Sequence, residues 1–251
     1  MYTHSLFQFI VNMKKYPISI FLLFLFSNTF AINDKIRLGF MASPGLGWFS
    51  PKGSDLKNAG IGYAMNYGLV FEYYFKDQNY GIQTGLLGGL ENGILKDRSV
   101  FQINTGKTDI VERYNNQFIA IPVYLKLKTN SLKKFHIYGQ VGFELNFTLS
   151  SRASFSKNLF DVTNNNVFEV NKENIISKKN AVTSVIPEFK SNFFDFRIAA
   201  GTGFEYDLTD KVALLFGVKY HNGFVDVLND RDAKKDPIHV RNFLFNIGFM
   251  F

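Results

Sequence analysis

Few side chains in this sequence could serve as a nucleophile, a general base or a metal ligand, and they are widely spaced. The chain has no cysteine and four histidines. His136 starts one predicted strand and His221 ends another at the opposite end, so these two cannot share a site. His221 could approach Asp195 and Arg197, with Ser191 nearby, but this spacing matches no known pairing of nucleophile and base. We therefore predict no catalytic residue.

Motifs that bind metals, cofactors or nucleic acids are also missing from the sequence. There is no spacing of His, Asp and Glu typical of a metal site, and no phosphate loop or nucleotide motif. The net charge is +7, from 28 Lys and Arg against 21 Asp and Glu. The basic residues are spread over turns and loops without a basic stripe, so we expect no nucleic-acid partner. We predict no metal and no cofactor.

The charged residues do show a regular pattern, because they alternate with apolar ones. Between Gln117 and Lys128, the odd positions from Ile119 to Leu127 are all aliphatic and the even ones are mixed, which is typical of a β-strand with two different faces. Eight segments alternate in this way: Lys35–Phe49, Ile61–Phe75, Tyr80–Glu91, Gln117–Lys128, Phe135–Leu149, Phe193–Tyr206, Val212–His221 and Asn242–Phe251.

Within these segments every charged residue lies on the face opposite the apolar one. The set is Lys35, Arg37, Glu72, Glu91, Lys126, Lys128, Glu144, Asp195, Arg197, Glu205 and Lys219. A Lys or Arg facing lipid at the middle of a bilayer costs about 2–4 kcal/mol. Such strict sorting is therefore what a lipid-facing surface requires.

A soluble lipocalin-like barrel would show the same period of two, because the period alone does not say which face is inside. Volume distinguishes the two arrangements. The interior of an eight-stranded barrel is barely wide enough to be filled by side chains, and the apolar faces here carry too many Phe, Tyr, Leu and Ile to fit. The opposite faces are rich in glycine. We therefore expect an all-β fold: a closed, antiparallel, up-and-down transmembrane barrel of eight strands.

Aromatic residues gather near both ends of the strands, as in the interfacial girdles of membrane barrels. Toward the long connections these are Trp48, Tyr63, Phe147, Phe194 and Tyr220. Toward the short connections they are Tyr73, Phe75, Tyr80, Phe135, Tyr206 and Phe251.

Short and long connections alternate along the chain. The short ones are Lys76–Asn79, Thr129–Lys134 and Asp207–Lys211, and the long ones are Ser50–Gly60, Asn92–Asn116, Ser150–Asn192 and Asn222–Arg241. This alternation predicts periplasmic turns, external loops and two periplasmic termini. Loop 150–192 either extends its two strands or adds a hairpin, which would give ten strands. It is also where we expect a surface that binds a protein partner.

The first 31 residues resemble a secretory signal peptide. Lys14 and Lys15 precede the apolar run Ile18–Phe26, and small residues at Thr29 and Ala31 suit a cleavage site. Met13 is an alternative start of translation. Residues 32–251 then form a single outer-membrane barrel domain.

Several stretches resemble the PorT-type outer-membrane β-barrel family of Bacteroidota. They are Arg37-Leu-Gly-Phe, Ile119-Ala-Ile-Pro-Val-Tyr-Leu-Lys-Leu-Lys128, Ile137-Tyr-Gly-Gln-Val-Gly142, Ala200-Gly-Thr-Gly-Phe-Glu-Tyr206 and Asn246-Ile-Gly-Phe-Met-Phe251. This chain has Ala120 where family members often carry an acid. A barrel of eight strands has the small OmpA/OmpX-like size. For the family's named member, the resemblance implies a role in protein export and gliding.

The inward-facing charges should form an ion-paired plug, because an unpaired buried charge costs several kcal/mol. The predicted lumen charge network is Arg37, Glu72, Lys126, Glu144, Asp195, Arg197, Glu205 and Lys219. The outward residues of the last strand resemble the C-terminal signal read by the outer-membrane assembly machinery: Phe245, Ile247, Phe249 and Phe251.

We therefore expect a non-enzymatic integral protein of the outer membrane with a structural, binding or secretion-accessory role. A narrow channel for small solutes is the alternative, followed by a lipid-modifying or proteolytic barrel that would depend on His221. The expected partners are outer-membrane lipid and the assembly machinery, and the protein is expected to be a monomer.

Overall fold

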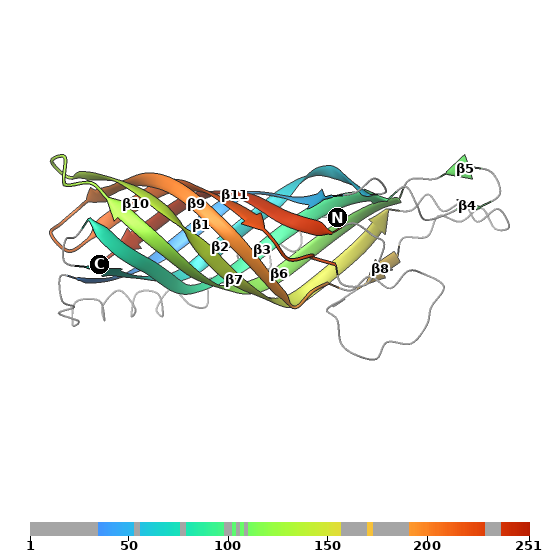
Figure 1. Ribbon diagram of the computed structural model, residues 1–251, viewed down its shortest axis with the longest axis horizontal. Helices are drawn as coiled ribbons and strands as arrows, with labels where there is room; N and C mark the ends of the chain where they lie inside the picture. Colours follow the sequence, from blue (N-terminus) through green and yellow to red (C-terminus); the bar gives the residue numbers. More distant parts are fainter. Residues whose placement is uncertain are drawn as a thin grey trace, which may run out of the picture.

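The chain forms a closed antiparallel β-barrel of eight long strands (Figure 1), as predicted. The computed structural model describes residues 35–52, 56–75, 79–97, 102–103, 106–107, 110–156, 170–172, 191–228 and 237–251. The long strands are β1 (Ile36–Pro51), β2 (Leu56–Tyr74), β3 (Tyr80–Asp97), β6 (Ile110–Lys128), β7 (Phe135–Ser156), β9 (Phe194–Asp207), β10 (Ala213–Gly223) and β11 (Ile238–Met250). Each pairs with the next one along the chain, and β11 pairs with β1, so the barrel has no open edge.

Three short strands lie outside the barrel wall or extend it. β4 (Gln102–Ile103) pairs with β5 (Gly106–Lys107), and β8 (Val170–Lys172) pairs with β7. All three lie at the loop end (Figure 1). No helix among the described residues is long and apolar enough to cross a membrane. The predicted signal peptide and most of loop 150–192 lie outside the described residues.

The pairing register fixes the tilt of the strands. A row of paired residues followed around the barrel from Ile137 returns to β7 at Phe147, a shear of ten residues. For eight strands this shear gives a tilt of roughly 40°, within the usual range for barrels. The interior is then only wide enough to be packed with side chains.

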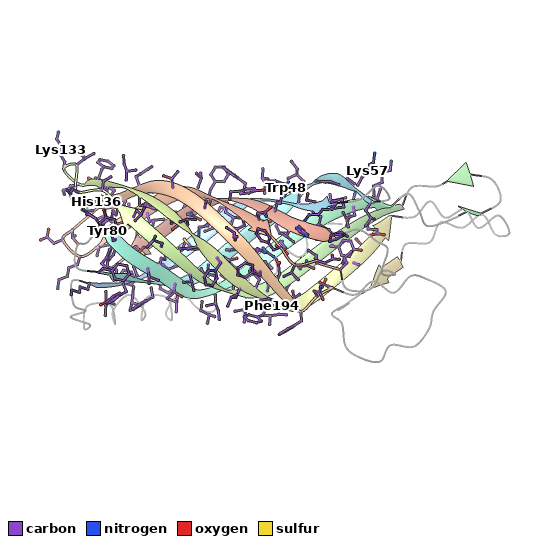
Figure 2. All side chains as sticks on the ribbon, viewed as in Figure 1. Trp48, Lys57, Tyr80, Lys133, His136 and Phe194 are labelled. Atoms are coloured by element: carbon purple, nitrogen blue, oxygen red, sulfur yellow. The ribbon has the colours of Figure 1, made fainter. Side chains whose placement is uncertain are left out.

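The large apolar residues face outward and cover the barrel wall (Figure 2). Tyr67, Leu86, Ile137 and Phe245 expose 47%, 57%, 53% and 50% of their surface, although they lie in the middle of regular strands. A soluble protein would bury such residues, so this surface is suited to contact with hydrocarbon.

The inward faces were predicted to carry charged residues and many glycines, but large apolar side chains lie there as well. A buried apolar cluster lies among the polar residues: Met41, Val70, Leu87, Phe118, Ala120, Tyr138, Leu215 and Met250. Phe118 fits because its ring lies over Gly89 on the neighbouring strand, where a Cβ atom would be 2.2 Å from the ring. Glycines on one strand thus make room for large side chains on the next.

The strands continue beyond the boundaries that the alternation predicted. β2 starts at Leu56, β3 runs to Asp97, β6 starts at Ile110 and β7 runs to Ser156, so parts of the predicted loops are strand. In these extensions the pattern inverts: Lys57 and Arg113 face outward, while Leu95 and Tyr114 are buried inside. Outward-facing charged residues suit contact of this part of the wall with water rather than with lipid.

Pro122 interrupts the β3–β6 ladder, as expected for a residue without an N–H. Thr84 pairs with Val123 and Leu87 pairs with Ala120 in one common register, but the two positions between them are unpaired. Pro122 still pairs with Glu144 on the other side.

Candidate functional site: the filled lumen

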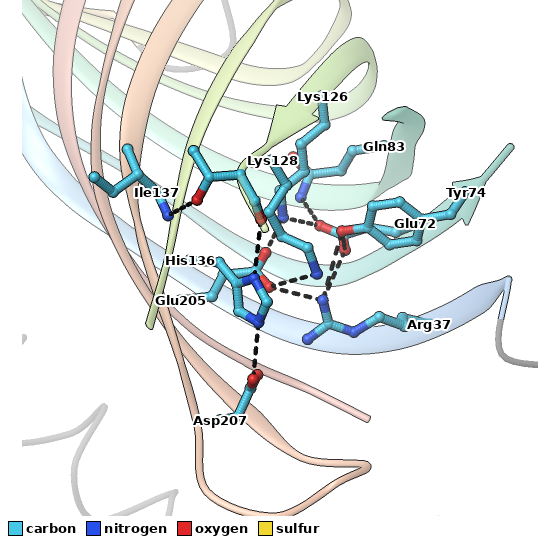
Figure 3. Close-up of polar contacts among 11 residues, drawn as sticks. Arg37, Glu72, Tyr74, Gln83, Lys126, Lys128, His136, Ile137, Glu205 and Asp207 are labelled. Carbon is cyan, nitrogen blue, oxygen red and sulfur yellow. Dashed lines mark hydrogen bonds and ion pairs between the residues drawn. The ribbon is translucent and has the colours of Figure 1, made fainter. Parts of the chain in front are cut away.

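All eight residues of the predicted charge network point into the lumen, where they form groups at different heights. The group nearest the turns joins Arg37, Glu72, Lys126, Lys128 and Glu205 (Figure 3). Arg37 Nη1 lies 2.8 Å from Glu205 Oε2 and 3.6 Å from Glu72 Oε2. Lys126 donates to both carboxylates, and Lys128 Nζ lies 3.5 Å from Glu205. We call these five residues the turn-side cluster.

Neutral side chains complete the hydrogen bonding of the turn-side cluster. The Tyr74 hydroxyl and the Gln83 amide each donate to a Glu72 oxygen at 2.8 Å. The ammonium groups of Lys126 and Lys128 lie 4.6 Å and 4.9 Å from the ring centroids of Tyr138 and Tyr74. Buried charges require such complete pairing, and sequence reasoning did not identify these tyrosines as partners.

His136 lies at the rim beside the turn-side cluster and does not take part in it. Its Nε2 atom lies 2.8 Å from Asp207 Oδ2, and its Nδ1 atom lies 3.0 Å from the carbonyl oxygen of Thr129 (Figure 3). These contacts hold the turn after β6 against the end of β9. A structural role accounts for all of them.

A second group, the loop-side cluster, consists of Glu91, Asp195 and Arg197. Arg197 Nη1 lies 2.8 Å from Glu91 Oε2, and Arg197 Nε lies 2.5 Å from Asp195 Oδ2. Asn242 donates to Glu91 at 3.3 Å. The guanidinium carbon of Arg197 also lies 4.9 Å from the centroid of the Phe118 ring. One cation thus serves two buried carboxylates.

Lys219, Tyr124, Glu144 and His221 lie between the two clusters. The Tyr124 hydroxyl donates to Glu144 at 2.9 Å, and the Lys219 ammonium lies 4.4 Å from the Tyr124 ring centroid. His221 is completely buried, and its Nδ1 atom is 3.7 Å from Glu144 Oε1. The carboxylate beside His221 is therefore Glu144, whereas the sequence suggested Asp195.

An apolar cap closes the lumen on the loop side of these charges. It consists of Phe49, Leu56, Leu95, Tyr114, Ala153, Val227, Leu228, Ile238 and Val240, all buried. Val227 and Leu228 come from the connection after β10. Backbone hydrogen bonds hold Val227 to Ile238 and Asn192 at 2.9 Å and 2.8 Å. The signal for the cap was the inverted alternation of the strand extensions, which were predicted to be loops.

The last strand closes the barrel at its turn end. Phe245, Ile247 and Phe249 face outward with 41–50% of their surface exposed. Phe251 exchanges backbone hydrogen bonds with Leu38 of β1, at 2.7 Å and 2.8 Å. The predicted assembly strand therefore also joins the first strand to the last.

The described residues contain no group of three or more His, Cys, Asp or Glu side chains that could hold a metal ion. Comparison with protein families gives a match over residues 26–229 to the outer membrane protein beta-barrel domain. The chain belongs to that family. Membership places this barrel in the outer membrane as an integral protein. No curated protein matches the chain.

Several solved outer-membrane barrels have a similar fold. Neisserial surface protein A is 9% identical, with a TM-score of 0.38, over 85% of this chain and 94% of that one. OprG from Pseudomonas aeruginosa is 18% identical, with a TM-score of 0.35, over 84% and 94%. The protease OmpT from Escherichia coli is 10% identical, with a TM-score of 0.36, over 87% and 96%. At such identities the likeness concerns the fold alone.

Proposed function

We propose that this family member is a non-enzymatic barrel whose lumen is sealed, and that it acts as a structural, binding or secretion-accessory component of the outer membrane. The observation that carries the proposal is the filling of the lumen. The turn-side cluster, the residues around Glu144 and the loop-side cluster lie in series below the apolar cap. The resemblance to the PorT-type family favours the secretion-accessory role.

The burial of His221 supports a role without catalysis. A general base must reach the proton that it removes, within about 3 Å or through one water molecule. His221 is completely buried and Ser191 is 1% exposed, and Ser191 forms a β-bridge with Leu228 of the apolar cap. A substrate would have to displace that cap to reach either side chain.

In the proposed orientation the short turns and both termini face the periplasm, and the long loops face outward. The outward strand Phe245–Phe251 is then available to the assembly machinery, and the closed wall requires no second copy, which supports a monomer. Loop 150–192 is the proposed site for a protein partner. Photo-crosslinkers placed along that loop in native membranes would identify the neighbour.

Single-channel recording in planar bilayers tests the sealed lumen. The wild-type protein is expected to give no steady conductance. Reversal of a lumen charge in Lys126→Glu or Arg197→Glu is compared with Lys133→Glu, a matched reversal on an exposed turn. A steady wild-type conductance that Lys126→Glu or Arg197→Glu abolishes and Lys133→Glu leaves intact would overturn the proposal in favour of a channel.

A further inference from the structure

Three buried polar side chains form a row across the inner face of the barrel, between the turn-side cluster and the loop-side cluster. They are Asn246 on β11, Ser43 on β1 and Asn66 on β2, and each exposes at most 2% of its surface. Ser43 pairs directly with Asn66. The β1–β11 register that pairs Ala42 with Ile247 places Asn246 opposite Ser43. We call these three residues the polar row.

Large side chains close the polar row at both ends. Gly217 pairs with the β11 member of the row, and the Tyr138 hydroxyl lies over this glycine, 2.3 Å from where a Cβ atom would be. Gly89 pairs with the β2 member, and the Phe118 ring lies over it in the same way. The row therefore lies in an enclosed part of the lumen.

The polar row lies well inside the membrane-spanning part of the barrel. Asn66 is six residues from Glu72 along β2. At 3.3 Å per residue and a tilt of about 40°, the row lies roughly 15 Å from the turn-side cluster along the barrel axis. Phe245 and Ile247, the outward neighbours of Asn246, belong to the lipid-facing surface. The turn-side cluster and the apolar cap thus lie between the row and bulk water.

The side chains of the polar row carry hydrogen-bonding atoms without partners. In the described part of the chain, no group bonds to Ser43 Oγ, to Asn66 Oδ1, or to Nδ2 or Oδ1 of Asn246. The Tyr138 hydroxyl beside the row also lacks a hydrogen bond of normal geometry. Each buried polar group left without a partner costs about 1–3 kcal/mol. Folded proteins rarely keep several such groups together, and ordered water commonly supplies their partners.

The charge balance of the lumen favours a neutral occupant of the row over an ion. Below the apolar cap the described cations are Arg37, Lys126, Lys128, Arg197 and Lys219, and the described carboxylates are Glu72, Glu91, Glu144, Asp195 and Glu205. With histidine neutral, these five positive and five negative charges cancel. An ion in the row would add an unbalanced buried charge, which costs several kcal/mol. The row offers amide oxygens, an amide nitrogen and a hydroxyl, so its occupant should both donate and accept hydrogen bonds.

We propose that the polar row binds a short string of internal water molecules in the membrane-spanning part of the lumen. Directly paired Cβ atoms lie about 5 Å apart, so one water molecule can bridge two neighbouring short side chains of the row. An internal water makes about three hydrogen bonds, so about two molecules satisfy the row and the Tyr138 hydroxyl. The filled lumen thus contains a hydrated section between its ion-paired clusters.

Nuclear magnetic resonance of the full chain in phosphatidylcholine nanodiscs tests this inference through cross-relaxation between water and side-chain protons. In the wild type, the Nδ2 and Hβ protons of Asn66 and Asn246 should show cross-peaks to water. The row variant Ser43→Ala/Asn66→Leu/Asn246→Leu removes the polar atoms that hold the water. The methyl groups introduced at these three positions should therefore show no cross-peak to water.

The control variant Ser131→Ala/Asn130→Leu/Asn58→Leu makes the same three replacements at exposed positions and should leave the cross-peaks of the row intact. Three results would overturn the inference. They are a wild-type row without water cross-peaks, water cross-peaks at the introduced methyl groups of the row variant, or row amide resonances that shift when caesium replaces sodium or bromide replaces chloride. The last result would show an ion in place of water.

Both variants must first show the heat-dependent gel mobility of a folded barrel. If the row variant does not fold, the wild-type cross-peaks and their response to the change of salt decide the question by themselves.

Discussion

The loop-side cluster allows the sharpest test of how the lumen is stabilised. Arg197 is 2% exposed and forms ion pairs with both Glu91 and Asp195, on β3 and on its own strand β9. No other Lys or Arg in the described part of the chain lies within ion-pair distance of either carboxylate. The substitution Arg197→Met therefore leaves two buried carboxylates without their cation and removes little volume.

Removal of one partner from a buried ion pair costs about 3–5 kcal/mol, because the remaining charge stays desolvated. We expect Arg197→Met to lose that amount of unfolding free energy. The triple variant Arg197→Met/Glu91→Gln/Asp195→Asn removes the stranded charges as well, so it should regain most of the loss. Lys133→Met, on an exposed turn, should stay within about 0.5 kcal/mol of wild type.

Urea unfolding from phosphatidylcholine vesicles measures these differences. Trp48 is the one tryptophan in the chain and lies on the outer wall, so its fluorescence reports loss of the lipid environment. The slope of free energy against urea must be the same in all variants for the comparison to hold. A loss below about 1 kcal/mol in Arg197→Met, or a triple variant no more stable than the single one, would refute the reasoning.

Other features of the barrel give further predictions. Gly89→Val should lower the unfolding free energy by about 1–3 kcal/mol in the same urea assay, because the new valine side chain would overlap the Phe118 ring. Gly139→Ala should leave it unchanged, because no atom lies within 4 Å of a Cβ at that position. Deletion of Phe251 should slow assembly into vesicles, measured by heat-dependent gel mobility, because the two backbone hydrogen bonds with Leu38 at the turn end of the β1–β11 pairing are lost.

The sequence could predict which face of each strand contacts lipid, because charged side chains are excluded from the hydrocarbon of the membrane. Phe245, Ile247 and Phe249 face outward as expected, and Lys126 and Arg197 face inward. A shift of one residue along a strand would exchange its two faces and place a charged side chain in hydrocarbon, at a cost of about 2–4 kcal/mol. The alternation of short and long connections then gave the up-and-down order, and the apolar volume gave the side that faces lipid.

The ends of the strands could not be predicted in the same way. In the strand extensions the inner face of the wall contacts the apolar cap, and the outer face carries exposed charged residues. The alternation of apolar and polar residues therefore weakens and then inverts there. Leu95 and Tyr114 inside, with Lys57 and Arg113 outside, follow the same period of two as the membrane part. The inversion appears only once the wall is known to continue, and the apolar cap was missed for that reason.

By itself the sequence determined which side chains of the eight alternating segments enter the lumen, because that depends on position within a single strand. Only the tertiary structure decided which of them meet. Arg37 and Glu205 are 168 positions apart and join at 2.8 Å, and Glu144 rather than Asp195 lies beside His221. Such contacts depend on how eight tilted strands are staggered when the barrel closes, and that stagger is a property of the whole sheet, which no single strand encodes.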